Sequence, residues 1–449
     1  MLLQAPSAGR LSQARAAAVR DGKSGATGAL PPVLLTTANY NGTLAAVRSL
    51  GRHGIRVTTA DPSRLAVSGW SRFTTARVQS PGVQDTGRFL AWLLEYGRTH
   101  GKHVLLPTSD DTAWLYALHR DRLSEYFHLA SPTFDTIAGL LNKRRLYQSA
   151  VDAGLHVPRT WFPDTAADLE RIRTEARFPV VVKPVTQVMF TTQSKGMLAE
   201  SPDQLAARYA EFARQTYSPA LHDVDPSASR PMVQEFFPEA ATAIYNISAY
   251  VRKGRLTGAR AARKLLQQPR RLGTGVCFEE AAVVPELAAG LERLVSRAGF
   301  SGVFEAEFID TPEHPVLIDF NPRFYNQMEF DIARGLPLPL LAYFDALGRD
   351  QDFDRLVSSP RAGGRPPQSV YVDLFSLRLI LFAQRLSGAL SRAERKKWTR
   401  WYRTNRHRCT HSVLDRTDRM PALAAAVQLL IGHARHPRNF LRSMVLNRS

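Results

Sequence analysis

Residues 303–310 alternate apolar and acidic side chains with the two-residue period of a β-strand. Successive side chains of a strand point to opposite faces, so this pattern separates an apolar face from an acidic one. The apolar face holds Phe304, Ala306 and Phe308, and the acidic face holds Glu305 and Glu307. The segment therefore predicts a half-buried strand with two carboxylates on its open face.

Residues 316–321 predict a second strand of the same kind. Alternation places Val316, Ile318 and Phe320 on an apolar face. Leu317, Asp319 and Asn321 then lie on the opposite face. Two prolines interrupt the intervening residues, which favours a hairpin. A hairpin would gather carboxylate and amide oxygens, the ligands that suit Mg²⁺. Two plain amphipathic strands that face solvent are the simpler alternative, although Asp and Asn are poor strand formers.

Earlier segments predict an α/β region. Residues 33–61 predict a strand–helix–strand unit, and residues 103–107 predict a strand that ends in the polar group 108–111. Ligand sites in open α/β sheets lie at such carboxyl ends. Asp61 follows the second strand, as in a dinucleotide site, but the preceding turn has one glycine where that fingerprint needs three. The pattern therefore disfavours NAD.

Composition adds a basic C-terminal end. A length of 449 residues predicts two or three domains. The two cysteines lie far apart in sequence, which fits a reducing cytoplasm better than a disulfide framework or a zinc site. Residues 361–449 hold 18 Lys and Arg against 4 Asp and Glu, within a net charge of +19. Such a tail predicts an anionic partner: a membrane surface, nucleic acid or a polyanionic substrate. No segment reads as a bilayer span.

The ordered motifs of residues 33–345 resemble the ATP-grasp superfamily, especially its carboxylate–amine ligases of the D-aspartate-ligase-like and carbamoyl-phosphate-synthetase-like type. The motifs are LPTSDD, NKRRLYQSAVDAGLHVPRT, FPVVVKP, MVQEFFPEA, RKLLQQPRRLGTG and GVFEAEFID followed by PVLIDFNPR. The resemblance implies an α/β (α+β) chain with the ATP-grasp fold, an N-terminal Rossmann-like pre-ATP-grasp domain and a C-terminal basic helical extension. We expect a disordered tail (1–30), a pre-ATP-grasp βαβ domain (31–135), an ATP-grasp domain (136–350, with subdomains 136–235 and 236–350) and the helical extension (366–449).

The resemblance also implies roles for single residues. Lys143 and Lys183 would contact the nucleotide and its phosphates, Gln234 and Glu235 the adenine, and Glu239 the ribose. The metal ligands for Mg²⁺ or Mn²⁺ would be Glu307, Asp319 and Asn321, with Glu305 beside them or in solvent. Arg323 would face the phosphoryl group being transferred. Arg263 is preferred to Arg260 and Lys264 as a substrate or phosphate clamp, with a solvated basic loop as the alternative.

Two positions depart from the family pattern. Asp319 stands where the family usually has glutamate, and its side chain is shorter by one methylene. The phosphate-covering loop, residues 186–196, has one glycine where many relatives have several, which leaves its order and a phosphate role for Lys195 open.

The resemblance implies an ATP-dependent ligase that joins a small carboxylate to an amine through an acyl phosphate. Catalysis would rest on positioning and charge neutralisation by Lys183, Arg323 and the metal. We expect a cytoplasmic protein, with a homodimer as the default, that contacts a membrane or another anionic surface through residues 366–449. An ATP-binding regulatory or membrane-surface adaptor without turnover is the alternative.

The aromatic residues of the tail leave a further choice open. Trp398, Trp401 and Tyr402 lie among cations, as in proteins that stack on nucleic-acid bases. The same pattern fits an amphipathic helix at a membrane interface, or helices packed on the ligase body. We prefer the membrane surface to nucleic acid because residues 377–382 are rich in Leu, Ile and Phe.

Overall fold

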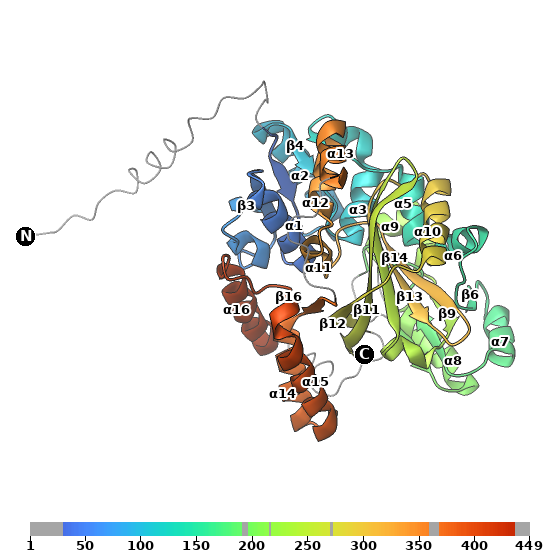
Figure 1. Cartoon of the computed structure of the whole chain (residues 1–449). Helices are drawn as coiled ribbons and strands as arrows, with labels where there is room; N and C mark the ends of the chain where they lie inside the picture. Colours follow the sequence, from blue (N-terminus) through green and yellow to red (C-terminus); the bar gives the residue numbers. More distant parts are fainter. Residues whose placement is uncertain (1–29, 191–195, 215–216, 270–272, 359–367, 436–449) are drawn as a thin grey trace, which may run out of the picture. The chain divides into compact units, whose positions relative to one another are not determined.

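The computed structural model describes residues 30–190, 196–214, 217–269, 273–358 and 368–435. By its internal contacts the chain divides into a short unit that ends at Pro31 and a second unit from Pro32 onward. The helices and strands of the second unit are labelled in Figure 1.

The first sheet is parallel and has the strand order β3-β2-β1-β4-β5. Its strands are β1 (Val33–Leu35), β2 (Val57–Asp61), β3 (Thr74–Gln79), β4 (His103–Leu105) and β5 (Phe127–His128). The accompanying helices are α1 (Asn41–Arg52), η1 (Val67–Trp70), α2 (Thr86–His100), α3 (Asp110–Leu118) and α4 (Arg120–Ser124). The strand–helix–strand unit predicted at residues 33–61 is β1–α1–β2. Because the strands are parallel, the carboxyl ends of β1, β2 and β4 meet at one edge.

The second sheet is antiparallel, in the order β6-β9-β7-β8. Its strands are β6 (Thr160–Trp161), β7 (Val180–Lys183), β8 (Met197–Ala199) and β9 (Met232–Glu235). The helices of this part are α5 (Phe134–Leu141), α6 (Lys143–Asp152), α7 (Ala166–Glu175), α8 (Pro202–Ala213), α9 (Pro219–Val224) and η2 (Pro226–Ser229). Ile172 of α7 and Leu205 of α8 pack on Val180 and Val182, so the two helices cover one face of this sheet.

The third sheet has seven strands in the order β14-β13-β10-β11-β12-β15-β16. Its strands are β10 (Ile244–Arg252), β11 (Arg255–Gln268), β12 (Thr274–Ala281), β13 (Gly302–Asp310), β14 (Pro315–Asn321), β15 (Val370–Val372) and β16 (Cys409–His411). The helical elements near it in sequence are η3 (Pro238–Ala241), α10 (Pro285–Arg297), α11 (Met328–Ala333), α12 (Leu338–Ala346) and α13 (Asp350–Ser358). Phe304 and Phe320 stack at 4.9 Å in a core that also holds Leu146 of α6 and Leu294 of α10.

Strands β13 and β14 form the predicted hairpin, but with a bulge that the sequence pattern does not contain. Glu307 pairs with Asp319, whereas the next residue along β13, Phe308, pairs with Leu317. The extra residue, Ile318, interrupts strict alternation. As a result, Leu317 joins Phe320 in the main core, while Val316 and Ile318 pack in a separate cluster with Ile244 and Ile309. The predicted division of β14 into two faces is therefore wrong for Val316, Leu317 and Ile318, and right for Asp319 and Asn321.

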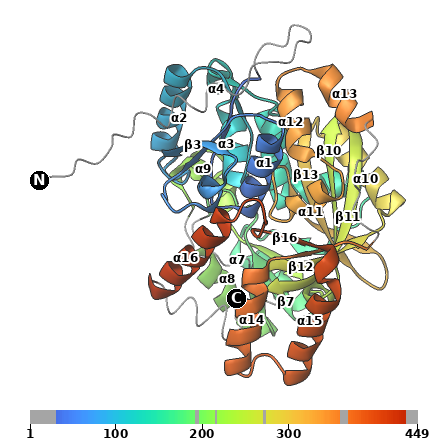
Figure 2. The same cartoon turned by 60° about the vertical axis from the view of Figure 1, so that its left-hand side comes forward.

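The C-terminal extension contributes strands as well as helices. The parallel pair β15 and β16 continues the third sheet beyond β12. Its helices are α14 (Leu374–Leu386), α15 (Arg392–Asn405), η4 (Arg406–Arg408) and α16 (Met420–Arg435). Helices α14 and α15 lie side by side in Figures 1 and 2, whereas α16 packs against η1. Over the described residues, every helix is too short or too polar to cross a bilayer.

Candidate active site

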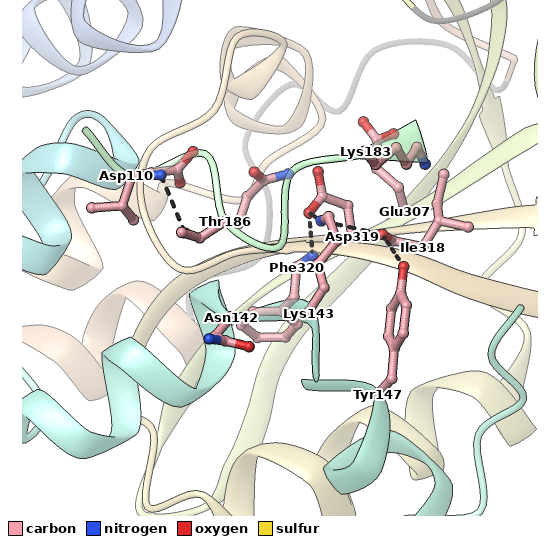
Figure 3. A network of polar contacts seen from close by, with 12 residues as sticks. Asp110, Asn142, Lys143, Tyr147, Lys183, Thr186, Glu307, Ile318, Asp319 and Phe320 are labelled. Carbon is pink, nitrogen blue, oxygen red and sulfur yellow. Dashed lines mark hydrogen bonds and ion pairs between the residues drawn. The ribbon is translucent and has the colours of Figure 1, made fainter. Parts of the chain in front are cut away.

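Helix α6 brings Lys143 onto the β13–β14 hairpin. The side chain of Asn142 caps this helix by accepting from the backbone N–H of Arg144 at 3.0 Å, and Lys143 N donates to Val185 O just beyond β7 at 2.9 Å. Lys143 Nζ lies 2.6 Å from Asp319 Oδ1, and Figure 3 shows this contact. Burial is the largest single influence on the pKa of Lys143 and lowers it, but the charges of Asp319 and Tyr147 and the hydrogen bond to Asp319 together outweigh burial and raise the pKa. Lys143 is therefore a buried permanent cation.

A chain of hydrogen bonds connects Lys143 to Lys183 at the end of β7. Tyr147, one turn along α6, donates to Ile318 O at 3.1 Å and accepts from Gln234 Nε2 at 3.0 Å. Lys183 Nζ donates to Gln234 Oε1 at 3.0 Å. Gln234 is 2 % exposed, so its side-chain amide orients Lys183 and Tyr147. Two cations from different elements thus converge beside the hairpin, as Figure 3 shows.

The two carboxylates of the hairpin that face this group are each paired with a lysine. Glu307 is the cross-strand partner of Asp319, and both of its oxygens lie 2.9 Å from Lys264 Nζ of β11. Paired carboxylates on neighbouring strands repel unless positive charge lies among them. Lys143 and Lys264 supply that charge in this arrangement.

Glu305 and Asn321 form the next cross-strand pair and are both buried. Glu305 accepts hydrogen bonds from Asn246, Gln327 and Asn321, the last at 3.2 Å. Burial, followed by the charge of Glu307, raises the pKa of Glu305 to about 7. Of the two expected places for Glu305, solvent is wrong: Glu305 is buried and lies beside Asn321, from which it accepts a hydrogen bond.

These residues fit a hard divalent cation only with help from a substrate. Among the described residues, no three His, Cys, Asp or Glu side chains lie close enough to hold a metal ion. The predicted set has two carboxylates, Glu307 and Asp319, and the amide of Asn321. Mg²⁺ is usually held by one or two carboxylates together with water and substrate phosphates, so the donor set fits that cation.

Arg323 is held by the first sheet. Its Nε and Nη2 donate to the two oxygens of Asp110 at 2.9 and 3.2 Å, and Nη2 also donates to Asn321 Oδ1 at 2.7 Å. Asp110 is the first residue of α3, the helix that follows β4. Burial is the largest single influence on the pKa of Arg323 and lowers it, but the charge and hydrogen bonds of Asp110, with the charges of Glu305 and Asp319, together outweigh burial and raise the pKa. The carboxyl end of β4 therefore orients a guanidinium toward the hairpin.

The remaining predicted residues lie outside this group. Arg263 is 52 % exposed and pairs with Asp310 at 2.6 Å, while the adjacent Lys264 points to Glu307. Of these two neighbours, Lys264 and not Arg263 therefore contacts Glu307. Glu235 ends β9 and Glu239 lies in η3. Their contacts with a nucleotide stay predictions, and Lys195 lies outside the described residues.

Three residues of the group were not among the predicted site residues. Asp110 belongs to a strand-end polar group that could have been chosen, but nothing local pairs it with Arg323. Lys264 directly follows Arg263. Neighbouring residues of a strand point to opposite faces, and the sequence does not show which face meets the carboxylates of the hairpin. Tyr147 follows Lys143 by four residues, the spacing that places two side chains on one side of a helix.

No protein-family model matches the sequence, and no curated protein matches it. Solved structures do match. The L-amino acid ligase from Bacillus licheniformis is 15 % identical with a TM-score of 0.54, over 74 % of this chain and 78 % of that chain. The biotin carboxylase domain of the Hydrogenobacter thermophilus 2-oxoglutarate carboxylase, in complex with MgADP, ADP and bicarbonate, is 12 % identical with a TM-score of 0.57, over 72 % and 70 %.

A third similar structure is the N5-carboxyaminoimidazole ribonucleotide synthetase from Thermus thermophilus. It is 14 % identical with a TM-score of 0.51, over 75 % of this chain and 81 % of that chain. At these identities the likeness concerns the fold and not the reaction. From residue order, sheet topology and these likenesses together, the chain has the ATP-grasp fold.

Proposed function

We propose that this protein is an ATP-dependent ligase that joins a carboxylate to an amine. The observation that carries the proposal is the gathering of Lys143, Lys183, Lys264 and Arg323 beside the β13–β14 hairpin. Lys143 pairs with Asp319 and Lys264 with Glu307, while Lys183 is held by Gln234 and Arg323 by Asp110. Four cations from different elements in one place suit a polyanion such as a nucleoside triphosphate with its metal.

The chemistry needs no nucleophilic side chain. A carboxylate oxygen of the substrate attacks the γ-phosphorus of ATP, the bond to the bridging oxygen breaks, and ADP leaves. The amine nitrogen then attacks the acyl carbon, phosphate leaves, and the nitrogen loses a proton to water. In this proposal Lys143, Lys183 and Lys264 neutralise phosphate charge and Arg323 stabilises the transferred group.

A bound Mg²⁺ would supply further positive charge on the phosphate oxygens. Glu307, Asp319 and Asn321 would hold it, and the two lysines that pair with these carboxylates would then be available to the phosphates. Asp110 keeps Arg323 oriented while substrates exchange, because the bidentate contact fixes the plane of the guanidinium.

Release of ADP from Mg-ATP, measured over a panel of carboxylates with amines, tests the proposal. Lys183→Ala and Asp319→Ala should each lower substrate-dependent ADP release about 100-fold or more, since the first removes a cation that neutralises phosphate charge and the second removes a carboxylate that would hold Mg²⁺. Arg144→Ala is the matched control, because Arg144 adjoins Lys143 but its side chain is 53 % exposed. Circular dichroism melts would establish that the variants are folded.

Two outcomes contradict the proposal in different ways. Wild-type turnover in both Lys183→Ala and Asp319→Ala would mean that the site lies elsewhere. ATP binding by the wild-type protein without ADP release on any pair of substrates would favour the adaptor alternative.

We further propose that α14 and α15 place the ligase on an anionic lipid surface. The aromatic residues of the tail are packed inward: Trp398 is 7 % exposed and Trp401 Nε1 donates to Glu279 at 2.7 Å. The outer side carries exposed cations at helical spacing, namely Arg392, Arg395, Lys396, Arg400 and Arg403. Phe382, 66 % exposed on α14, lies between the exposed Arg378 and Arg385. Cations around an exposed apolar side chain suit lipid headgroups, whereas buried rings cannot stack on bases.

Vesicle co-sedimentation with and without phosphatidylserine tests the lipid proposal. The triple variant R392E/K396E/R403E should lose binding to the anionic vesicles, and F382S should weaken it. The control reverses two exposed cations of α7, R171E/R173E, and should bind like the wild-type protein. Equal sedimentation of the triple variant and the wild-type protein would overturn the proposal.

A further inference from the structure

A cavity lies at the carboxyl end of β2, at the edge of the first sheet. It measures about 460 Å³ and lies between the β2–β3 face and the segment that leads into η1. This β2 pocket is lined by Thr59, Asp61, Arg64, Trp70, Arg77 and Gln79, among others. Its volume is that of a small-molecule site, and its position at strand carboxyl ends is where open α/β sheets bind ligands.

The wall of the β2 pocket is held in place from two sides. Ser68 N donates to Ala38 O at 2.9 Å, which fixes η1 to the turn after β1. Gln428 of α16 donates to Leu65 O at 2.8 Å. The C-terminal helix therefore braces the segment that forms the wall.

The β2 pocket presents two arginines and one carboxylate that do not neutralise one another. Arg77 stacks over the ring of Trp70 at 4.3 Å, and Arg64 Nε reaches Gln79 at 3.4 Å. Neither guanidinium forms an ion pair with a described residue, and neither does the carboxylate of Asp61. A guanidinium stacked on an aromatic ring is fixed in orientation while its N–H groups stay available to a carboxylate or phosphate.

Asp61 supplies the complementary acceptor. One of its oxygens accepts from Ser63 N at 2.9 Å. Burial raises the pKa of this carboxyl, although hydrogen bonds from Ser63, Ala38 and Asn39 oppose the rise. A half-buried carboxylate without a cation is stabilised by an ammonium or hydroxyl group of a ligand.

The β1–α1 turn, which contains Tyr40, connects the β2 pocket to the Arg323–Asp110 pair. Ala38, two residues before Tyr40 in the β1–α1 turn, lines the pocket, and Thr37 Oγ1 in the same turn lies 2.6 Å from Thr108 Oγ1, two residues before Asp110. The start of α1 also touches the segment after Arg323: a Cβ on Gly42 would lie 2.6 Å from Tyr325 O. That close approach leaves no room for a side chain at residue 42.

We propose that the β2 pocket binds the amine substrate of the ligase, and that this substrate carries a second, anionic group. Arg64 and Arg77 hold the anionic group, Asp61 holds a hydroxyl or ammonium group, and the reacting amine extends past Tyr40 toward Arg323. The inference rests on the proposed ligase function for its placement, but binding to the pocket can be measured without turnover.

Binding is tested by the shift in melting temperature with three probes and no ATP. The probes are phosphoethanolamine, β-alanine and ethanolamine, which differ in carrying a phosphate, a carboxylate or no anion. The wild-type protein should be stabilised by the first or second probe and not by ethanolamine. The stronger of the two anionic probes identifies the class of anion.

Variants assign the binding to this pocket. Arg77→Gln and Asp61→Asn should each weaken the effective probe about 10- to 100-fold, the loss expected for one charge-assisted hydrogen bond. Arg77→Lys should restore part of it. Arg56→Gln is the matched control, because Arg56 is exposed at the opposite end of β2 and should leave probe binding unchanged.

The outcomes separate this inference from the proposed function. If no anionic probe shifts the wild-type melting temperature, or if Arg77→Gln binds like the wild-type protein, the β2 pocket is not this site. If Arg77→Gln loses the probe while the wild-type protein never releases ADP, the pocket stands and the ligase function falls. In an active enzyme, Arg77→Gln should raise KM for the amine and leave KM for ATP unchanged.

Discussion

Among the arginine–aspartate pairs that join distant parts of the chain, Arg48–Asp418 and Arg323–Asp110 differ in how far water can reach them. Arg48 and Asp418 are each 1 % exposed, with Arg48 Nε 2.9 Å from the carboxylate. Arg323 and Asp110 have the same 2.9 Å separation but are each 18 % exposed. The sealed pair can only hold structure together, whereas the open pair can also meet a charged ligand.

The surroundings of the two pairs extend the contrast. Asp418 also accepts from Ser71 Oγ at 2.7 Å and Arg72 N at 2.8 Å, so its charge is satisfied by the protein alone. The Arg48–Asp418 pair and the hydrogen bonds from Ser71 and Arg72 together form a clasp, which ties the residues between β16 and α16 to the first sheet. Near Asp110, by contrast, Asp111 remains a second carboxylate with a pKa raised to about 6 by burial and then by Asp110. The same pair of residue types thus serves anchorage in one place and charge placement in the other.

The largest effect is expected on breaking the sealed pair. Asp418→Ala leaves the Arg48 guanidinium buried and without a countercharge, which should cost about 3–5 kcal/mol of unfolding free energy. Urea unfolding followed by circular dichroism measures the loss. ADP release per folded molecule should stay near the wild-type value, and a loss beyond about 10-fold would mean that the clasp also shapes the active site.

The open pair should respond in the opposite way. Asp110→Asn keeps the shape but removes the charge that orients Arg323, so we expect kcat for ADP release to fall about 10- to 100-fold. KM for ATP and the urea midpoint should change little. Asp110→Glu keeps the charge and should retain more activity than Asp110→Asn. Equal kcat in Asp110→Asn and wild type would remove Arg323 from the mechanism.

Asp111 makes the open region sensitive to pH. Its folded pKa of about 6 lies above the usual 3.8, so its contribution to stability is full below about pH 4 and is lost as pH rises through 6. Asp111→Asn does not titrate. Its unfolding free energy should therefore improve relative to the wild-type protein by roughly 1–2 kcal/mol between about pH 4.5 and pH 7.5.

Urea midpoints at the two pH values measure this difference. Asp203→Asn is the control, because the Asp203 side chain is 90 % exposed. If the difference in unfolding free energy between Asp111→Asn and the wild-type protein does not change with pH, burial does not raise the pKa of Asp111.

The smallest effect is expected at the Asp415–Arg52 pair, a partly exposed ion pair near the clasp. Asp415 pairs with Arg52 at 2.5 Å, but the Arg52 side chain is 37 % exposed. Asp415→Ala should therefore cost only about 0–1 kcal/mol, the range of exposed ion pairs. A loss as large as that of Asp418→Ala would show that burial does not separate the two pairs, and differential scanning calorimetry of both variants would reveal it.

Local patterns predicted much of the fold and part of the site. The β1–α1–β2 unit, the β13–β14 hairpin and the placement of Lys183 at the end of a buried strand all depend on residues close in sequence. Asp319 and Asn321 also face the site as expected, because the bulge lies before them. The order of the motifs indicated the ATP-grasp fold, which the topology and the similar structures bear out.

The remaining features depend on contacts that a sequence pattern does not contain. The pairing of Arg323 with Asp110 spans 213 positions, and the bulge at Ile318 arises where two strands meet. The choice of Lys264 over Arg263 depends on which face of β11 the rest of the sheet covers. The packing of Trp398 against β12 and β15 replaces the interfacial role that its neighbours in sequence suggested.

The sequence by itself determined that β1, β2, β13 and β14 are strands, which lysine ends a buried strand, and where carboxylates gather on one face, since these follow from local periodicity and chemistry. Only the tertiary structure decided which cation meets which carboxylate, and which of two like arginine–aspartate pairs is sealed. Burial and register are properties of several segments packed together, and they set the strength and the accessibility of each charge.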